Sequence, residues 1–286
     1  MVTENRFDWK SRQNKDGGWS YGRGSAASSA SWTEPTVFAF LAQSVTVQDE
    51  ESLAAAVRFL RGMARNDGGF QPQPGVTEST WVTSLVTLLP VEVIGESATK
   101  AAIGWLKNQT GQESGWQYRF QQWRNGNKDS FPQAWAWFPG AAAWAIPTTI
   151  GILAFERALT RGDDNALRRR IETAREFLLG RQCADGGWNH GSNRALGRDG
   201  DSYPETTGLT LLAFAGTGRT AAIDKALATA ERHLAACRTA EGISWLRMGL
   251  AAHGRPAKSD VTPAIRTNMD AALVALADAP ENPLLS

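Results

Sequence analysis

Carboxylates are the residues of this chain best suited to proton transfer, and several of them stand at the starts of predicted helices. They are Asp199, Asp201, Glu34, Glu78 and Glu205. A carboxyl group acts as a general acid only if it is protonated at the working pH. Because a helix N-terminus lowers a carboxyl pKa, such a role requires that desolvation outweigh the helix dipole. The alternative is that these carboxylates cap their helices and complement the dipole.

Tryptophan is the second informative residue type, because the chain has 12 of them and only some fall in the repeated turns described below. A segment at about 117–145 is rich in aromatic residues and contains two prolines. Long insertions of this kind often form lids or cavity walls, and plain filling of the hydrophobic core is an equal alternative. The tryptophans outside the turns are Trp32, Trp81, Trp123, Trp135, Trp137 and Trp144.

Metal and disulfide chemistry find little support. Cys183 and Cys237 lie far apart and form no Cys-x-x-Cys pair, which predicts buried thiols in a reducing compartment. His190 and Cys183 flank one turn, but the two further ligands of a tetrahedral zinc site are missing. We therefore expect neither a metal nor a cofactor.

The composition limits the classes of protein to which this chain can belong. The 286 residues include 30 basic and 29 acidic side chains, so no net field favours nucleic acid or anionic lipid. The first residues contain acids and no apolar run, which argues against a signal peptide and predicts a cytoplasmic protein. Residues 134–155 carry no charge, but Pro139 and Pro147 interrupt them, which favours a buried loop and helix over a membrane span.

A short glycine turn recurs along the chain. Its clearest copies are the Asp-Gly-Gly-aromatic sequences at 16–19, 67–70 and 185–188, and residues 115–116 and 240–245 are predicted to be degenerate copies. Glycine supplies the positive φ that the turn needs, and the aromatic side chain is expected to pack between neighbouring hairpins. A glutamine that can hydrogen-bond the turn precedes three copies: Gln13, Gln109 and Gln182.

Two kinds of helix alternate around these turns. Helices before a turn are amphipathic, as at 167–178, whereas those after a turn are nearly uncharged all round, at 35–42, 79–89, 147–155 and 205–214. A helix that is apolar on every face must be buried on every face or line an enclosed cavity. We therefore predict two concentric layers of helices in one domain spanning 1–286, built from about five repeats. The uncharged inner helices favour a closed ring over an open solenoid.

The repeats resemble those of a known family. The segments Phe177-Leu178-x3-Gln182-x4-Gly187-Trp188 and Trp105-Leu106-x2-Gln109-x5-Gly115-Trp116 are similar to the QW repeats of squalene and oxidosqualene cyclases and to the repeats of protein prenyltransferase β subunits. The resemblance extends over nearly the whole chain and implies an all-α fold, an α/α toroid. In relatives the central apolar cavity of this toroid holds an isoprenoid chain. Parallel inner helices would bring the helix-start carboxylates to one mouth of that cavity.

The resemblance also implies chemistry that can be compared with the residues present. Squalene-type cyclases use an Asp-x-Asp-Asp motif, and the nearest match is Asp199-Gly200-Asp201-Ser202, which lacks the last aspartate and also fits a solvated loop. Protein prenyltransferases bind zinc through Asp, Cys and His, but the corresponding segment at 201–208 has neither Cys nor His. The converging helix ends could instead bind an anion such as a diphosphate, although no cluster of basic residues joins them.

The sequence thus predicts a terpene-cyclase-like or prenyltransferase-like protein with an aromatic cavity for an isoprenoid. If it is an enzyme, the resemblance implies a class II terpene cyclase that starts cyclisation by protonation. The alternative is a non-catalytic toroid that binds an isoprenoid or a protein partner; a glycan-acting enzyme fits the uncharged inner helices poorly. The expected acids are Asp199, Asp201 and Glu205, and the expected ligand-binding residues are Trp32, Glu34, Glu78, Trp81, Trp135, Trp137, Trp144 and Tyr203.

Overall fold

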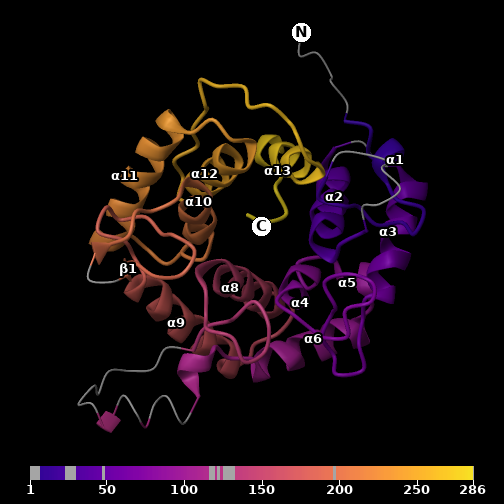
Figure 1. Cartoon of the computed structure of the whole chain (residues 1–286), viewed down its shortest axis with the longest axis horizontal. Helices are drawn as coiled ribbons and strands as arrows, with labels where there is room; N and C mark the ends of the chain where they lie inside the picture. The colour runs from indigo at the N-terminus through magenta and orange to yellow at the C-terminus, as the bar shows by residue number, and fades with distance from the viewer. Residues whose placement is uncertain are drawn as a thin grey trace.

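A computed structural model describes residues 7–22, 30–46, 49–115, 120, 123–124, 133–195 and 198–285. The helices form two concentric layers around a central axis, as Figure 1 shows. The inner layer contains α2 (Thr33–Val45), α4 (Val82–Val86), α8 (Ala145–Leu159), α10 (Pro204–Leu212), α12 (Ala240–Ala252) and α13 (Asn268–Asp278). The outer layer contains α3 (Glu50–Gly62), α6 (Glu96–Asn108), α9 (Asn165–Gly180) and α11 (Ala221–Ala236).

Short elements complete the described part of the chain. They are α1 (Trp9–Arg12), α5 (Val91–Ile94), the 3-10 helix η1 (Gln112–Ser114), and the two-stranded antiparallel sheet of β1 (Arg194–Ala195) and β2 (Arg198–Asp199). The fold is therefore all-α, an α/α toroid, as the sequence predicted. None of the helices in these described ranges combines the length and the apolarity needed to cross a bilayer.

The inner helices close into a ring. Each packs against the next in the order α2, α4, α8, α10, α12 and α13, and α13 packs back against α2. The prediction of a closed ring is thus confirmed by contact between the first and last inner helices. Closure buries both sides of each inner helix, which explains why these segments carry so few charges.

The closest packing in this ring joins α10 to α12. Neither Gly208 nor Gly249 has room for a side chain: a Cβ on Gly208 would lie 2.3 Å from the backbone nitrogen of Leu246, and one on Gly249 would lie 2.3 Å from the Gly208 carbonyl oxygen. Glycine at both positions allows the two backbones to touch.

The repeated turns connect the two layers by the same hydrogen bonds in each copy. In the turns at 16–19, 67–70 and 185–188, the aspartate accepts a hydrogen bond from the backbone N–H of the second glycine. The aromatic residue then donates its backbone N–H to a threonine hydroxyl in the first turns of the following inner helix. The pairs are Trp19 to Thr36 (3.0 Å), Phe70 to Thr83 (2.9 Å) and Trp188 to Thr207 (3.0 Å).

The glutamines bind the turn and also reach the next outer helix. Gln13 Nε2 donates to the carbonyl oxygens of Gly17 and Ser52, both at 2.8 Å, and Gln182 Nε2 donates to those of Gly186 (2.8 Å) and Ala222 (2.9 Å). The predicted glutamine–turn hydrogen bond is confirmed for these two residues. Since Ser52 and Ala222 lie in the first turns of α3 and α11, each glutamine also joins one repeat to the following one.

Two details of the predicted repeats were wrong. Residues 240–245 form the start of α12 rather than a degenerate turn. Trp135, which the sequence placed outside the turns, occupies the turn position between α6 and α8. Its backbone N–H donates to Thr148 Oγ1 (3.1 Å) and its indole N–H to the Leu106 carbonyl oxygen (3.0 Å), as Trp188 does to Thr207 and Leu178. Trp116, the aromatic residue expected there, lies outside the described residues.

The α10–α12 contact gives a testable prediction. Gly208→Ala should destabilise the protein by about 2 kcal/mol or more, because the added methyl group meets backbone atoms that cannot move aside. Gly104→Ala, on the outer helix α6, should instead be neutral or stabilising by up to about 1 kcal/mol, because a Cβ there meets nothing within 4 Å. Chemical denaturation of the two variants measures the difference, and equal stabilities would contradict the packing described above.

Candidate functional site

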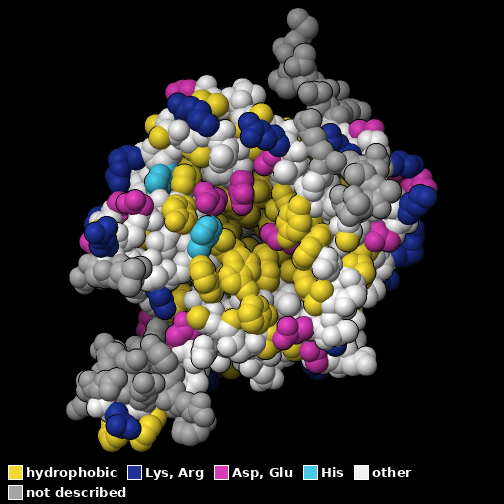
Figure 2. All heavy atoms as spheres, in the orientation of Figure 1, with side chains coloured by type: hydrophobic (Ala, Val, Ile, Leu, Met, Phe, Trp, Pro, Cys, Tyr) yellow, Lys and Arg dark blue, Asp and Glu magenta, His cyan; other side chains and the backbone are white. Residues whose placement is uncertain are grey.

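A cavity of about 190 Å³ lies inside the ring, at the end where the inner helices begin. Figure 2 shows this face of the molecule, with a hollow at its centre surrounded by apolar and acidic side chains. The residues that line the cavity are Glu34, Phe38, Trp81, Leu85, Trp137, Ile146, Ile150, Glu205, Leu209, Glu241, Trp245 and Met269.

The lining residues form two layers with helical spacing. All six inner helices contribute a residue from their start: the N-cap residue Trp81 of α4, and the second residue of each of the others, Glu34, Ile146, Glu205, Glu241 and Met269. Five of the helices contribute again four residues later, through Phe38, Leu85, Ile150, Leu209 and Trp245. Because residues i and i+4 lie one above the other on a helix, the first set forms the mouth and the second set the floor.

Three glutamates therefore converge at the mouth. Glu34 and Glu205 were expected near the cavity, whereas Glu241 was not, because the segment at 240–245 was predicted to be a turn. The signal that could have identified it is the capping threonine at 239 followed two residues later by a glutamate. Glu241 retains contact with solvent at the mouth, and Glu34 and Glu205 are partly buried.

Desolvation is the main influence on two of these carboxyl groups. It raises the pKa of Glu34 to about 7; a hydrogen bond from Tyr21 opposes this shift, and the nearby charge of Glu241 adds to it. Desolvation by the protein around the mouth also raises the pKa of Glu241, and the nearby charges of Glu205 and Asp270 raise it further. At Glu34 desolvation thus outweighs the hydrogen bond that favours the charged form, which is the condition for a carboxyl group that stays protonated near neutral pH.

Tyr21 holds the Glu34 carboxyl group, and no pattern in the sequence pointed to it. Its hydroxyl group donates a short hydrogen bond to Glu34 Oε2. The Tyr21 carbonyl oxygen accepts from the backbone N–H of Asn268 (3.2 Å), whose side chain donates to the Ser20 carbonyl oxygen (2.9 Å). Closure of the ring by α13 therefore fixes the segment that carries Tyr21. Burial and the Glu34 charge raise the pKa of the Tyr21 phenol, which keeps it a hydrogen-bond donor.

Aromatic side chains form much of the cavity wall. The rings of Trp81 and Trp137 meet edge to face with centroids 4.8 Å apart, and those of Phe38 and Trp245 do so at 5.8 Å. Trp137 comes from the predicted insertion, which thus contributes to the wall. Faces of such rings attract cations, most strongly in a desolvated site. Phe38 and Trp245 were not among the expected ligand-binding residues.

The other expected residues lie elsewhere. Asp199 is exposed on β2, Asp201 and Glu78 are exposed, and none of the three lines the cavity. Trp32, half-buried, has its ring 5.6 Å from that of Tyr21. Three more expected residues lie outside the lining. The Trp144 ring packs on Gly191, and the Tyr203 ring lies 5.0 Å from that of His190. Trp135 is buried in its turn.

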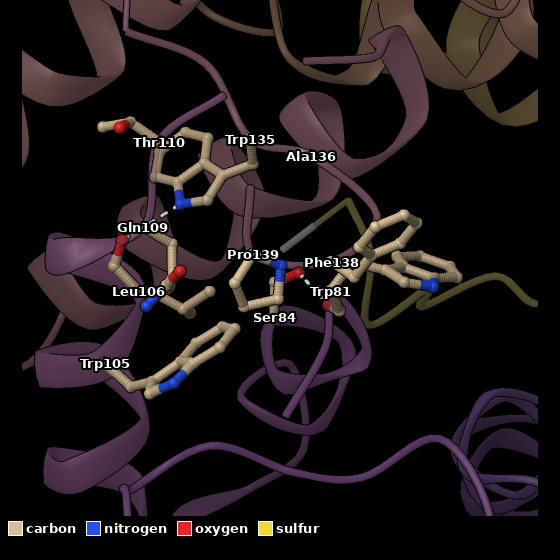
Figure 3. Close-up of a pocket in the computed structure, with 10 residues that line it drawn as sticks. All are labelled: Trp81, Ser84, Trp105, Leu106, Gln109, Thr110, Trp135, Ala136, Phe138 and Pro139. Atoms are coloured by element: carbon tan, nitrogen blue, oxygen red, sulfur yellow. Dashed lines mark hydrogen bonds between the residues drawn. The ribbon is translucent and has the colours of Figure 1, made fainter. Parts of the chain in front are cut away.

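Trp135 lines another, much smaller pocket. Figure 3 shows its lining, in which the Trp135 indole is turned toward Leu106 and Gln109 of α6 and its end. Its volume of about 10 Å³ is close to the least that holds one water molecule, so it is a packing defect rather than a ligand site. The Arg170 guanidinium lies over the Trp135 ring at 4.2 Å from its centroid, which supports a structural role for this residue.

Within the described ranges, no group of three or more His, Cys, Asp or Glu side chains is arranged to hold a metal ion. The chemistry that the three glutamates of the mouth can supply by themselves is the donation and acceptance of protons.

The ring of parallel inner helices with a cavity at their starting ends defines an α/α toroid. Solved structures of the type II terpene cyclase MstE from Scytonema share this fold: the ligand-free form gives a TM-score of 0.54 at 18% identity, over 92% of this chain and 73% of that one. A variant in complex with geranylgeranyl dihydroxybenzoate, described as its substrate, gives 0.55 at 17% identity, over 92% and 72%. A complex with its product, merosterolic acid A, gives 0.52 at 18% identity, over 92% and 73%.

These similarities establish the fold alone. No model of a protein family matches the sequence, and no curated protein matches it either.

The Tyr21–Glu34 contact gives a prediction for protonation. Tyr21→Phe should raise the pKa of Glu34 above about 7, because the lost hydrogen bond stabilises the charged carboxylate. Titration of ¹³C-labelled glutamate carboxyl groups by NMR, with Glu34→Gln to assign the signal, measures the shift. Tyr203→Phe removes a hydroxyl group that does not contact Glu34 and should leave this pKa unchanged. An unchanged pKa in Tyr21→Phe would show that the contact has no electrostatic effect.

Proposed function

We propose that this chain is a terpene-cyclase-like protein that binds an isoprenoid in its central cavity and starts cyclisation by protonation from Glu34. One observation carries the proposal: a glutamate whose pKa is raised to about 7 faces a cavity walled by tryptophans. A group with this pKa is largely protonated below neutral pH, so it can donate a proton. The likeness in fold to MstE, whose complexes contain a terpenoid substrate and product, supports the same class of ligand.

In the proposed reaction, Glu34 transfers its proton to one carbon of a ligand double bond. The π electrons form the new C–H bond, and the neighbouring carbon becomes a cation. The faces of Trp81, Trp137 and Trp245 stabilise this cation until a second double bond attacks it and closes a ring. Loss of a proton from an adjacent carbon to a carboxylate then gives a neutral product. Tyr21 stabilises the Glu34 carboxylate during this sequence.

Glu34 is preferred to the acids expected from the sequence. Asp201 and Asp199 are exposed and lie outside the cavity lining, so neither faces a ligand held in the cavity. Glu205 lines the cavity beside Glu241 and is a candidate for the carboxylate that accepts the final proton.

A second function, binding without conversion, has an observation of its own. A carboxylic acid with a pKa near 7 is a weak acid, and protonation of an isolated alkene is demanding for it. The same cavity would then serve a non-catalytic toroid that holds an isoprenoid or presents it to a protein partner.

Turnover experiments distinguish the two functions. Purified protein is incubated with acyclic terpenoid alcohols, their diphosphates and squalene, and products are identified by gas chromatography and mass spectrometry. Glu34→Gln should lower turnover at least about 100-fold, the contribution typical of a general acid, while isoprenoid binding persists. Glu96→Gln, an exposed acid in the first turn of α6, is the matched control and should leave turnover unchanged. Binding without any product in the wild-type protein would favour the non-catalytic toroid.

The pH dependence follows from the same assignment. Because the protonated form of Glu34 is the active one, the rate should be maximal below pH 7 and fall as pH rises through about 7. A pH–rate profile tests this, and in Tyr21→Phe the descending limb should move to higher pH. A rate that rises between pH 6 and 8 would exclude Glu34 as the proton donor.

A further inference from the structure

We propose that the central cavity takes an uncharged isoprenoid of about ten carbons, two prenyl units, rather than a longer chain or a diphosphate. The inference rests on the proposed function and deepens it by fixing the size and charge of the ligand. It derives from the volume of the cavity, its closed floor and the absence of basic side chains from its described lining.

Volume sets the length of the ligand. The cavity measures about 190 Å³. An apolar cavity of roughly 150 Å³ holds benzene, and pockets for drug-sized ligands begin at about 300 Å³. The cavity therefore accommodates somewhat more than a six-carbon ring, which corresponds to a folded chain of about ten carbons. A chain of twenty carbons would leave about half of its length outside.

The floor prevents extension through the ring. Its side chains come from five of the six inner helices, and each residue is at most 4% exposed: Phe38, Leu85, Ile150, Leu209 and Trp245.

The segment after α13 covers the other end of the ring, where Figure 1 shows the C-terminus near the centre. The Pro283 carbonyl oxygen accepts from Arg157 Nη1, in the last turn of α8, at 3.0 Å, and Leu284 is 8% exposed. A longer ligand can only project outward through the mouth.

The mouth selects against an anionic end. The cavity lining within the described residues includes Glu34, Glu205 and Glu241 and contains no Lys, Arg or His. The carboxyl groups already occupy the places where the positive ends of the inner helices would hold a phosphate. A diphosphate entering there would lose water without gaining a cationic partner, whereas a hydroxyl group can hydrogen-bond the carboxyl groups.

A chain-length series tests the proposal. Dissociation constants are measured by calorimetry for prenol, geraniol, farnesol and geranylgeraniol, which have five, ten, fifteen and twenty carbons, and for geranyl diphosphate. Each methylene buried contributes about fourfold in affinity. Affinity should therefore rise at least about 30-fold from prenol to geraniol and change less than about threefold beyond it, and geranyl diphosphate should bind at least about tenfold more weakly than geraniol.

A larger space at the floor should make the cavity prefer a longer ligand. In Leu209→Ala, the affinity ratio of farnesol to geraniol should rise about tenfold or more, because the shortened side chain opens the floor. Leu211→Ala is the matched control: it removes the same atoms from a buried leucine of α10 outside the cavity and should leave the ratio unchanged. If Leu209→Ala does not fold, Trp245→Phe, which shortens another side chain of the floor and keeps an aromatic ring there, replaces it.

The outcomes are distinct. Affinity that keeps rising to geranylgeraniol, tighter binding of the diphosphate than of geraniol, or an unchanged ratio in a folded Leu209→Ala or Trp245→Phe variant would each overturn the inference while leaving isoprenoid binding intact. If no member of the series binds, the proposed function itself fails, and this inference fails with it.

Discussion

The constraint on which the site depends is that all six inner helices begin at the same end of the ring. Their starting residues must then meet around the axis, and five of those residues occupy the same second position of their helices. Three are glutamates, which favourable interaction with the helix dipoles would ordinarily keep ionised. Packing around the mouth partly buries Glu34, and desolvation of its charge raises its pKa to about 7.

The repeated turns hold those helix starts in register. A threonine hydroxyl group near the start of the inner helix accepts a hydrogen bond from the backbone N–H of the aromatic residue in the turn. In α2 and α10 this hydroxyl group also donates to a carbonyl oxygen earlier in the chain: Thr36 to Trp32 and Thr207 to Trp188. The turn, tied to the next outer helix by Gln13 or Gln182, therefore determines where α2 and α10 begin. The scaffold residues outnumber the cavity residues and explain why the sequence signal for the fold is stronger than that for the function.

The alternation of amphipathic and uncharged helices was sufficient to predict two layers and a closed ring, because burial on every face leaves an inner helix little choice of partner. Four of the expected site residues line one cavity: Glu34, Glu205, Trp81 and Trp137. That they bind or react with a ligand stays a prediction.

The remaining details depend on contacts between segments distant in sequence. Tyr21 reaches Glu34 only because Asn268, at the start of the last inner helix, binds the loop that carries it. Trp135 was misplaced because an insertion separates it from Gln109, so that local spacing pointed to Gly115-Trp116. Glu241 was missed because a glycine and a tryptophan inside a helix resembled a turn.

The most direct test of a ligand site at the starting ends of the inner helices is a crystal structure of the protein grown with geraniol. We expect ligand density between Trp81, Trp137 and Trp245, with the chain above Phe38 and one end within about 4 Å of the Glu34 carboxyl group. A cavity closed by its own side chains, with the terpenoid absent or bound on another surface, would contradict the claim that the parallel inner helices create this site.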